Sequence, residues 1–136
     1  MNNIPIPWTK QARYLGVILD SHLTWKPHIK HVLTKFRARK LTLAPLIARD
    51  SALSLDNKIL LYKAMLRPIM TYASPVWGYV CHTHLNKLQV QQNAFLRQAT
   101  RCRWFIRNEA LHRELNVPTL NDYIKHLMKR FIKRIP

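Results

Sequence analysis

Lysine and arginine side chains carry the most obvious chemistry in this sequence. The chain has 23 Lys and Arg against six Asp and Glu among 136 residues, which gives a formal charge of +17. Such a charge repels itself unless a polyanion or an acidic neighbour lies beside it. Clustered Lys and Arg release counterions when they meet phosphates, so nucleic acid is the first partner to consider.

The acidic residues are too few and too scattered for phosphoryl-transfer catalysis. They are Asp20, Asp50, Asp56, Glu109, Glu114 and Asp122, and no two are closer than five residues in sequence. That chemistry needs carboxylates that hold metal ions together. We therefore expect no catalytic residue and no metal site, and a protein that holds a polyanion instead of cutting or joining it.

One basic face is expected on a helix that begins near Lys26 or Pro27 and ends or bends before Pro45. Its apolar stripe comprises Ile29, Val32, Leu33 and Phe36. Its candidate phosphate contacts are Lys26, Lys30, Lys35, Arg37, Arg39 and Lys40. The alternative is a solvated helix face. Acidic residues would normally be interleaved on such a face, and none occurs between Lys26 and Arg49.

A second candidate surface is the segment 97–107. Its arginines could clamp phosphates while its aromatic rings stack on bases of a single strand. The segment contains Arg97, Arg101, Arg103, Arg107, Trp104 and Phe105. The alternative, which we favour for the two aromatic residues, is that they fill a core between helices.

Cys81, His82 and His84 have the chemistry of metal ligands, and Cys102 or His112 could complete a zinc site. The usual CxxC and HxxxH spacings are absent, so metal binding is not expected. Two cysteines in a chain of this size indicate reduced thiols and an intracellular protein. A nuclear address would match the charge.

The elements that must position these residues are mainly helical. We expect a bundle of about five helices with a short N-terminal β element, because the chain has only two glycines and several apolar stripes of helical period. The β element is a strand over residues 12–19, in which Gly16 permits close approach of another chain. Pro5 and Pro7 make the preceding segment a poor partner, so the expected partner strand is missing.

Three further helices follow from capping residues and apolar periodicity. Ser54 can cap a helix that Pro68 kinks, Thr83 can cap the next, and Asn108 can cap a short one. The second helix has its stripe at Ile59, Tyr62, Leu66, Ile69 and Ala73, and the third at Leu85, Leu88, Gln92, Phe95 and Ala99. The short helix includes Ala110, Leu111 and Leu115.

The last helix opens on Thr119 with Asp122, a pattern like a capping box. Its apolar stripe comprises Leu120, Tyr123, Ile124, Leu127, Met128, Phe131 and Ile135, and we expect it to pack on the core. Lys125, Lys129, Arg130, Lys133 and Arg134 cover its other face. Such a basic amphipathic helix could instead lie on a membrane or in a partner's groove. The longest uncharged stretch, 68–86, is broken by prolines and histidines, so no membrane span is expected.

Four blocks of residues, in order, resemble the end of the polymerase domain of non-LTR retrotransposon reverse transcriptases, most of all the insect jockey-like group. The likeness spans about residues 12–120. The first block is 14–20 with 23–29, the second is 62–69 with 71–73 and 76–78, the third is 91–93 with 96–97, and the last is 104–108 with 111–112 and 114–119.

The resemblance implies a position within a polymerase. Residues 1–24 would be a remnant of the palm edge, with Leu15 and Gly16 in the hairpin that holds the primer end. Residues 25–136 would be the helical thumb and C-terminal region, which lies against the template–primer duplex. The partner would be an RNA–DNA hybrid or RNA, together with the rest of the polymerase.

The departures from that family also carry expectations. Its adjacent aspartate pair is absent, and Asp20 belongs to a different motif. The complete enzyme would use Mg²⁺, whereas this chain would hold no cofactor and show no polymerase activity alone. It looks like a truncated copy of a mobile element. The alternatives are a basic interaction module for acidic protein or RNA, and a chain that does not fold stably by itself.

Overall fold

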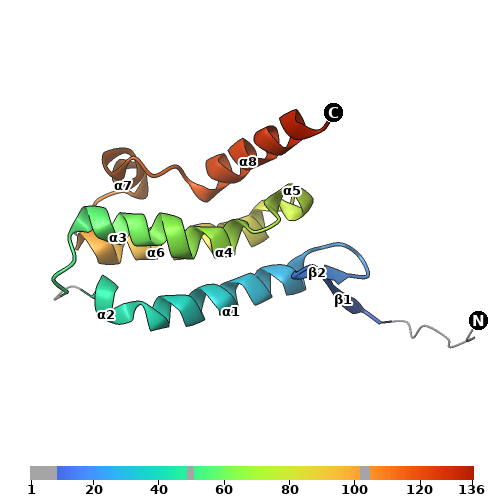
Figure 1. Ribbon diagram of the computed structural model, residues 1–136, viewed down its shortest axis with the longest axis horizontal. Helices are drawn as coiled ribbons and strands as arrows, with labels where there is room; N and C mark the ends of the chain where they lie inside the picture. Colours follow the sequence, from blue (N-terminus) through green and yellow to red (C-terminus); the bar gives the residue numbers. More distant parts are fainter. Residues whose placement is uncertain (1–8, 49–50, 102–104) are drawn as a thin grey trace, which may run out of the picture.

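The computed structural model describes residues 9–48, 51–101 and 105–136, and these are mostly helical (Figure 1). The strands are β1 (Gln11–Tyr14) and β2 (Val17–Asp20). The longer helices are α1 (Lys26–Thr42), α3 (Leu55–Leu61), α6 (His82–Thr100), α7 (Asn108–Leu115) and α8 (Leu120–Arg134). Shorter ones are α2 (Ala44–Ile47), the π-helical turn η1 (Tyr62–Leu66), α4 (Arg67–Thr71) and α5 (Ser74–Trp77).

The helices form three layers. Figure 1 shows α1 below, the α3–α4 segment with α6 in the middle, and α7 with α8 above. The middle layer packs on α1 through α4, η1 and α6, and α8 packs on α5 and α6. Mainly helical architecture with a short N-terminal β element is therefore confirmed.

The β element is a hairpin and not one strand over 12–19. Gln11 pairs with Asp20 and Tyr14 with Val17 in an antiparallel register. The turn residues Leu15 and Gly16 have φ of 51° and 81°, and two positive φ values suit the right-handed twist of a two-residue hairpin. The expectation that the partner strand is missing was wrong, because the chain folds back at Leu15 and β1 pairs with β2.

The hairpin is tied to the helices at three points. Val17 enters the core. The Ile18 N–H donates to Nδ1 of His28 on α1 at 3.3 Å. The Tyr72 hydroxyl, just after α4, donates to the Leu15 carbonyl oxygen at 2.7 Å. A Cβ at Gly16 would lie 3.2 Å from the Tyr72 ring, so glycine lets the turn sit against that ring.

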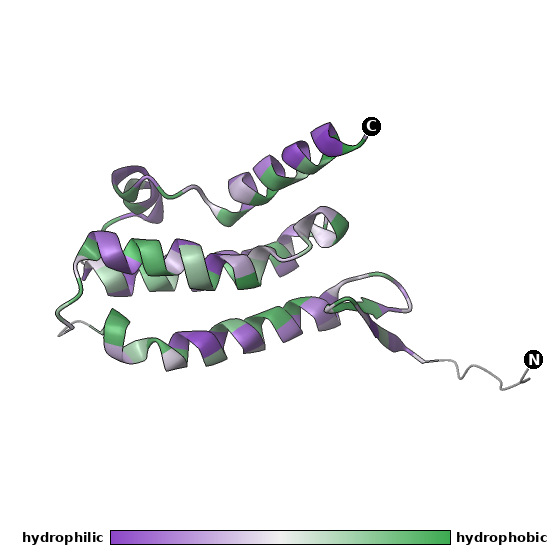
Figure 2. Ribbon diagram, viewed as in Figure 1, coloured by the Kyte–Doolittle hydropathy of each residue, from purple (hydrophilic) through white to green (hydrophobic). Residues whose placement is uncertain are grey.

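Helix α1 begins and ends where the sequence indicates. It starts at Lys26, has Pro27 in its first turn, and is followed by the separate turn α2 containing Pro45. The predicted stripe is confirmed, because Ile29, Val32, Leu33 and Phe36 are all buried. Figure 2 shows the hydrophobic side of α1 turned toward the middle layer and its hydrophilic side turned away.

The second predicted helix is interrupted, but the cause differs from a simple proline kink. Ser54 caps α3 as predicted, accepting from the Asn57 N–H at 3.3 Å. The chain then widens into η1 before α4, where Pro68 occupies the first turn. Tyr62 and Leu66 are buried, while Ile69 and Ala73 are only partly buried and pack against the core.

Helix α6 supplies the central seam of the bundle. All five predicted seam residues are buried, and the Tyr62 ring stacks on Phe95 with centroids 5.2 Å apart. Thr83 is not its cap, because α6 begins at His82 with Cys81 in the capping position. Likewise α7 begins at Asn108 after Arg107, so Asn108 lies in the first turn instead of capping it.

The last helix is packed over its first half only. Thr119 caps α8 as predicted, accepting from the Asp122 N–H at 3.3 Å, and Leu120 and Ile124 are buried. Toward the C-terminus, however, Phe131, Ile132 and Ile135 are 51%, 63% and 57% exposed. The expectation that the whole stripe packs on the core is thus wrong beyond Met128. Within the described ranges, no helix has the length and apolar character needed to cross a bilayer.

Candidate nucleic-acid interface

The six predicted phosphate contacts divide between two flanks of α1. At about 100° per residue, Lys26, Lys30 and Arg37 fall within about 40° of one another, and Lys35 and Arg39 lie about 180° away. Five of the six are exposed, and Lys40 is partly buried. The sequence therefore identified the basic residues of α1 but not their distribution around the helix. The expectation that all six form one row is wrong, because they divide between two flanks.

One flank of α1 forms a groove with α6. Arg37, Lys40 and Leu41 of α1 face Gln91 and Gln98 of α6 across a cavity of about 260 Å³. We call the surface formed by Lys26, Lys30, Arg37, Lys40, Lys87, Gln91 and Gln98 the α1–α6 face. Burial lowers the pKa of Lys40, because the charged ammonium loses part of its hydration.

Helix α6 contributes residues that sequence reasoning missed. Lys87, Gln91 and Gln98 lie on one side of α6, since positions four and seven residues apart recur on the same helical face. Among the residues that the structure describes, the Gln91 and Gln98 side chains have no hydrogen-bond partner, so these amides can still donate and accept. The signal that could have found them is the polar i, i+4, i+11 spacing beside an acid-free helix.

The α1–α6 face has no carboxylate of its own. Neither helix contains Asp or Glu, and the sequence has none between Asp56 and Glu109. A run of cations without interleaved acids gives a positive surface potential that intramolecular ion pairs cannot cancel. Together with free amides, this arrangement can hold phosphate oxygens along a strand, with Lys and Arg as countercharges and Gln as hydrogen-bond donors.

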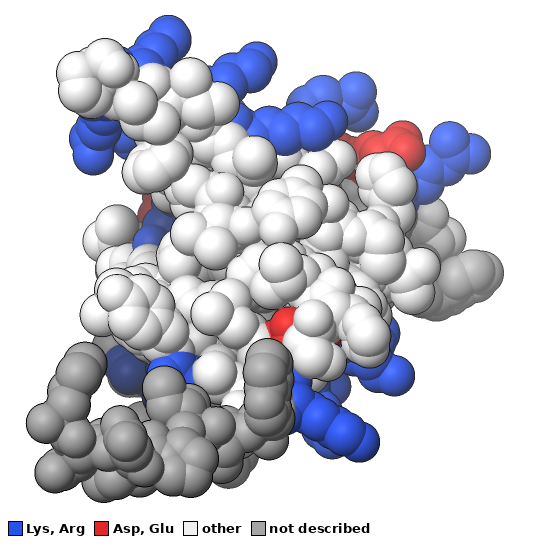
Figure 3. Space-filling model, turned by 90° about the vertical axis from the view of Figure 1, so that its right-hand side faces the viewer, with Lys and Arg blue, Asp and Glu red and all other residues white. Residues whose placement is uncertain are grey.

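The predicted primer-grip residues lie at the tip of the hairpin. Leu15 is 73% exposed, and Gly16 faces the Tyr72 ring. Figure 3 shows the end of the molecule that carries the hairpin, α5 and the end of α8: Lys and Arg stand around its edge and its middle is largely uncharged. Exposed apolar residues of this end include Tyr72, Val76 and Tyr79. The hairpin thus presents an apolar tip and not a cationic one.

Segment 97–107 is only partly described, since Cys102, Arg103 and Trp104 lie outside the described residues. Arg97 donates to the Asn108 side chain at 2.9 Å and to the Ile106 carbonyl oxygen, and so ties α6 to the start of α7. Phe105 is 60% exposed. The expectation that Phe105 fills the core is therefore wrong, because the chain passes over the surface at that point.

Asp20 is occupied in holding the connection between β2 and α1. Its carboxylate accepts from the Thr24 hydroxyl at 2.8 Å and from the N–H groups of Thr24 and Trp25 at 3.0 Å. Desolvation raises its pKa, but these hydrogen bonds outweigh that effect and lower the pKa to about 2. Its local role is therefore to fix a loop in which Leu23 and Trp25 have positive φ.

The cysteine and histidine cluster does not converge. In the described part of the chain, no three of the His, Cys, Asp and Glu side chains come together. Cys81 is exposed at the start of α6. His112 is engaged elsewhere, since its ring nitrogens lie 2.9 Å from the Val117 carbonyl oxygen and 2.8 Å from Oδ1 of Asn93.

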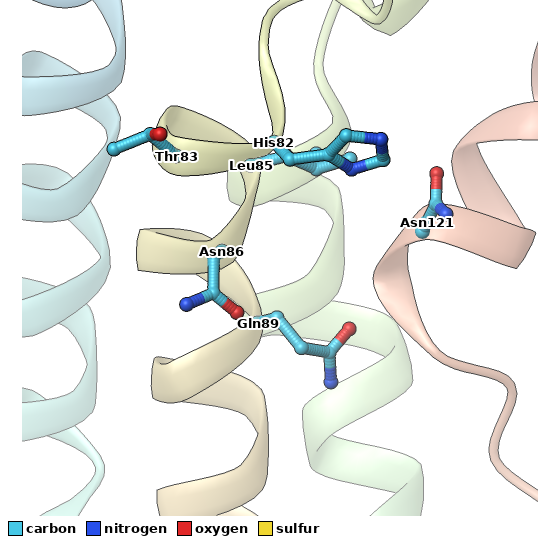
Figure 4. Close-up of a pocket in the computed structure, with 6 residues that line it drawn as sticks. All are labelled: His82, Thr83, Leu85, Asn86, Gln89 and Asn121. Carbon is cyan, nitrogen blue, oxygen red and sulfur yellow. The ribbon is translucent and has the colours of Figure 1, made fainter.

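A cavity of about 480 Å³ lies between the starts of α6 and α8, and Figure 4 shows its lining. Asn86, Gln89 and Asn121 contribute amides and His82 contributes an imidazole. The Gln89 oxygen is already occupied by the Leu120 N–H at 2.9 Å. Its lining residues include no Lys or Arg, so it is a weaker candidate for a phosphate strand than the α1–α6 face.

Several curated proteins match this chain over nearly its whole length. It is 37% identical over 135 residues to the probable RNA-directed DNA polymerase from transposon X-element of Drosophila melanogaster. It is 36% identical over 135 residues to the RNA-directed DNA polymerase from mobile element jockey of Drosophila funebris, and 34% over 125 residues to the probable RNA-directed DNA polymerase from transposon BS of Drosophila melanogaster.

These matches cover 99%, 99% and 92% of this chain, which spans only 15%, 15% and 14% of the relatives. No protein-family profile matches the chain. No solved structure matches it either.

Proposed function

Since the chain belongs, as a segment, with the RNA-directed DNA polymerases of jockey-like mobile elements, we propose that it grips a nucleic acid duplex without reading its sequence. In a complete polymerase this would be the work of a thumb, which lies along the template–primer duplex. The chain would contribute binding and not chemistry. The carboxylates that hold catalytic Mg²⁺ would lie in parts of the polymerase outside this sequence.

The observation that carries the proposal is the acid-free α1–α6 face. Its α1 cations Lys26, Lys30 and Arg37 are exposed and Lys40 is partly buried, and the neighbouring α6 adds one lysine and two uncommitted amides. Phosphate contacts position a protein on a duplex without carrying sequence information. An RNA–DNA hybrid is recognised mainly by its shape, backbone and 2′-hydroxyls, so a groove of lysines and amides suits it.

Two matched double variants test the proposal. Lys30→Gln with Arg37→Gln removes one Lys and one Arg from the α1–α6 face, and Lys129→Gln with Arg130→Gln removes the same two charges from the exposed side of α8. We expect the first pair to weaken binding to a primer–template hybrid about tenfold and to reduce the salt slope by about 1 per lost phosphate contact. The second pair should have a clearly smaller effect on the same hybrid.

Equal losses from the two pairs would mean that net charge alone is being sensed, and the α1–α6 face would lose its role. The competing substrate is a single strand of the same length. If the single strand binds more tightly than the hybrid, the exposed arginines beside Phe105 become the better candidates. Fluorescence anisotropy at several salt concentrations measures the binding of each double variant to the hybrid and to the single strand.

The rest of the polymerase is a second proposed partner, favoured by the largely uncharged middle of the end that carries the hairpin and α5. Leu15, Tyr72, Val76 and Tyr79 are exposed there, at 73%, 55%, 49% and 64%. Exposed apolar residues that share one end of a molecule commonly mark a contact with another protein surface. Co-expression with the preceding polymerase segment of a relative should protect the hairpin and α5 from hydrogen exchange, and unchanged exchange would contradict this contact.

A further inference from the structure

A small cavity lies where the hairpin turn meets α1 and α4, on the flank of α1 away from the α1–α6 face. Its volume is about 230 Å³. The residues that line it are Gly16, His28, His31, Val32, Lys35, Pro68, Ile69 and Tyr72. The α1 residues share one side of the helix because they are spaced at i, i+3, i+4 and i+7. The cavity therefore has a wall of nitrogen-bearing side chains and an opposite wall that is mostly apolar.

His28 is the buried member of that wall. It is 1% exposed, and Nδ1 accepts the Ile18 N–H. Burial, together with the nearby His31 and Lys35, lowers the His28 pKa to about 4, so the ring is neutral near pH 7. A neutral ring that accepts at Nδ1 carries its proton on Nε2. That N–H is buried and has no hydrogen-bond partner among the described residues.

His31 and Lys35 extend the same pattern toward the opening. Nε2 of His31 is also buried and unpaired in the described part of the chain. The pKa of His31 is lowered by burial, and next by the positive charges of Lys35 and Arg13. No Asp or Glu lines the cavity. Buried donors without acceptors are uncommon in folded proteins, and here they lie in a positive field.

We propose that this cavity binds one phosphate group, with Nε2–H of His28 and the His31 ring donating to phosphate oxygens and Lys35 supplying the countercharge. A metal ion is the wrong ligand for the site, because Lys35 and Arg13 would repel it. The volume is below the roughly 300–1,000 Å³ of sites that hold drug-sized ligands, and it suits a single tetrahedral oxyanion. The proposal does not depend on the α1–α6 face.

Imidazole nitrogen NMR on the intact chain tests the site directly. Inorganic phosphate is titrated at constant ionic strength against chloride, and the ring ¹⁵N shifts of His28 and His31 are followed. We expect both to move along one saturable curve. His126, exposed on α8, is the internal reference and should not move with it. Shifts that do not saturate, or that chloride reproduces, would overturn the proposal.

Matched lysine variants decide whether the cavity is the origin of the effect. Lys35→Gln should weaken phosphate binding about tenfold, as expected for the loss of one charge-assisted contact, whereas Lys129→Gln on α8 should leave it unchanged. Both lysines are exposed, so neither change should impair folding. His31→Gln provides a further variant that keeps a donor but removes the ring. Equal binding by all variants would overturn the proposal.

The source of the phosphate is distinguished by competition. An oligonucleotide with a 5′-phosphate, the same strand with a 5′-hydroxyl, and free phosphate are compared against the His28 signal. Displacement by both strands identifies internal phosphodiesters, displacement by the first alone identifies a strand end, and displacement by neither identifies free phosphate. Each of these results supports the site, because each requires a phosphate group in the cavity. The α1–α6 face fails or survives separately, through its own double variants.

Discussion

Two sides of α6 carry similar polar residues and use them in opposite ways. On one side, Gln89, Gln92 and Asn93 are joined in hydrogen bonds: the Gln89 amide donates to Oε1 of Gln92 at 2.7 Å and to Oδ1 of Asn93 at 2.9 Å. On the other, the Gln91 and Gln98 amides face only α1 across the groove. The residue types are alike, so the difference comes from what each side meets.

The engaged side meets the connection between α7 and α8, where backbone groups have no helical partner. Gln92 donates to the Pro118 carbonyl oxygen at 3.1 Å, and Gln89 accepts the Leu120 N–H. The first N–H groups of a helix need partners from outside it, and α6 supplies one of them. On the α1 side the Gln91 and Gln98 side chains have no hydrogen-bond partner among the described residues, so the amides there remain available to a ligand. The polar residues of α6 thus divide into a structural set, engaged in hydrogen bonds, and an open set, whose amides are not.

The strongest way to break this comparison is to remove Gln92, which is fully buried. Gln92→Ala deletes the donor to the Tyr62 hydroxyl, 2.7 Å away, and leaves a cavity between α6 and η1. We expect the free energy of unfolding to fall by about 3 kcal/mol, measured by urea denaturation. Gln91→Ala on the same helix is the control, and an equal loss there would abolish the distinction between the two sides.

His28 combines both situations in one ring, because Nδ1 accepts a hydrogen bond and Nε2 has no partner among the described residues. Its pKa falls from 6.5 unfolded to about 4 folded, so the unfolded chain binds the proton first as the pH drops. Stability should therefore be full above pH 6.5 and decline as the pH falls to about 4, by up to about 3 kcal/mol. Denaturation midpoints across this range measure the decline. His28→Gln should flatten it, and an unchanged slope would contradict the assignment.

The Tyr72 hydroxyl makes a hydrogen bond at the surface, and removing it should cost less than removing a buried one. Tyr72→Phe removes the hydrogen bond to Leu15 but keeps the ring against Gly16. Because Tyr72 is more than half exposed, the expected cost is about 0.5–1 kcal/mol. Amide exchange in the hairpin should accelerate while exchange in α6 stays the same. Acceleration throughout the molecule would show that the hairpin is not a separately docked element.

The smallest change in stability is expected on the side of α6 that faces α1. Gln91→Ala with Gln98→Ala should alter the unfolding free energy by no more than about 0.5 kcal/mol. The same double variant should nonetheless weaken hybrid binding a few-fold, because it removes donors from the α1–α6 face. Anisotropy and urea denaturation on the same preparation give the two values. A loss of stability without a loss of binding would place these amides in the structural set.

Periodicity and capping chemistry predicted most of the helices, because apolar stripes and hydroxyl caps act within a few residues. The stripe of α1 and the Thr119 cap are examples. The hairpin was missed because Leu-Gly lacks the Asn-Gly or Asp-Gly pattern that usually marks such a turn. What stabilises it is Tyr72, 57 residues away from Leu15. No local pattern reports a contact of that kind.

The candidate interface was predicted in part. The cations of α1 were found from composition, and their division between two flanks follows from helical spacing that could have been applied to them. The share contributed by α6 could not be found this way, because it depends on which helices lie side by side. The exposed end of α8 was also unforeseen, since an apolar stripe continues in the sequence whether or not a neighbour covers it.

The π-helical turn between α3 and α4 sets the rotation of everything that follows it. Each helical residue advances the chain by about 100°, so one residue fewer in Tyr62–Leu66 would swing α4 and Tyr72 through about a quarter-turn around the axis. The Tyr72 hydroxyl would then point away from the hairpin. The wide turn thus acts as a spacer that aims one phenol, and the number of residues from Ser54 to Tyr72 is constrained by a contact outside the helix itself.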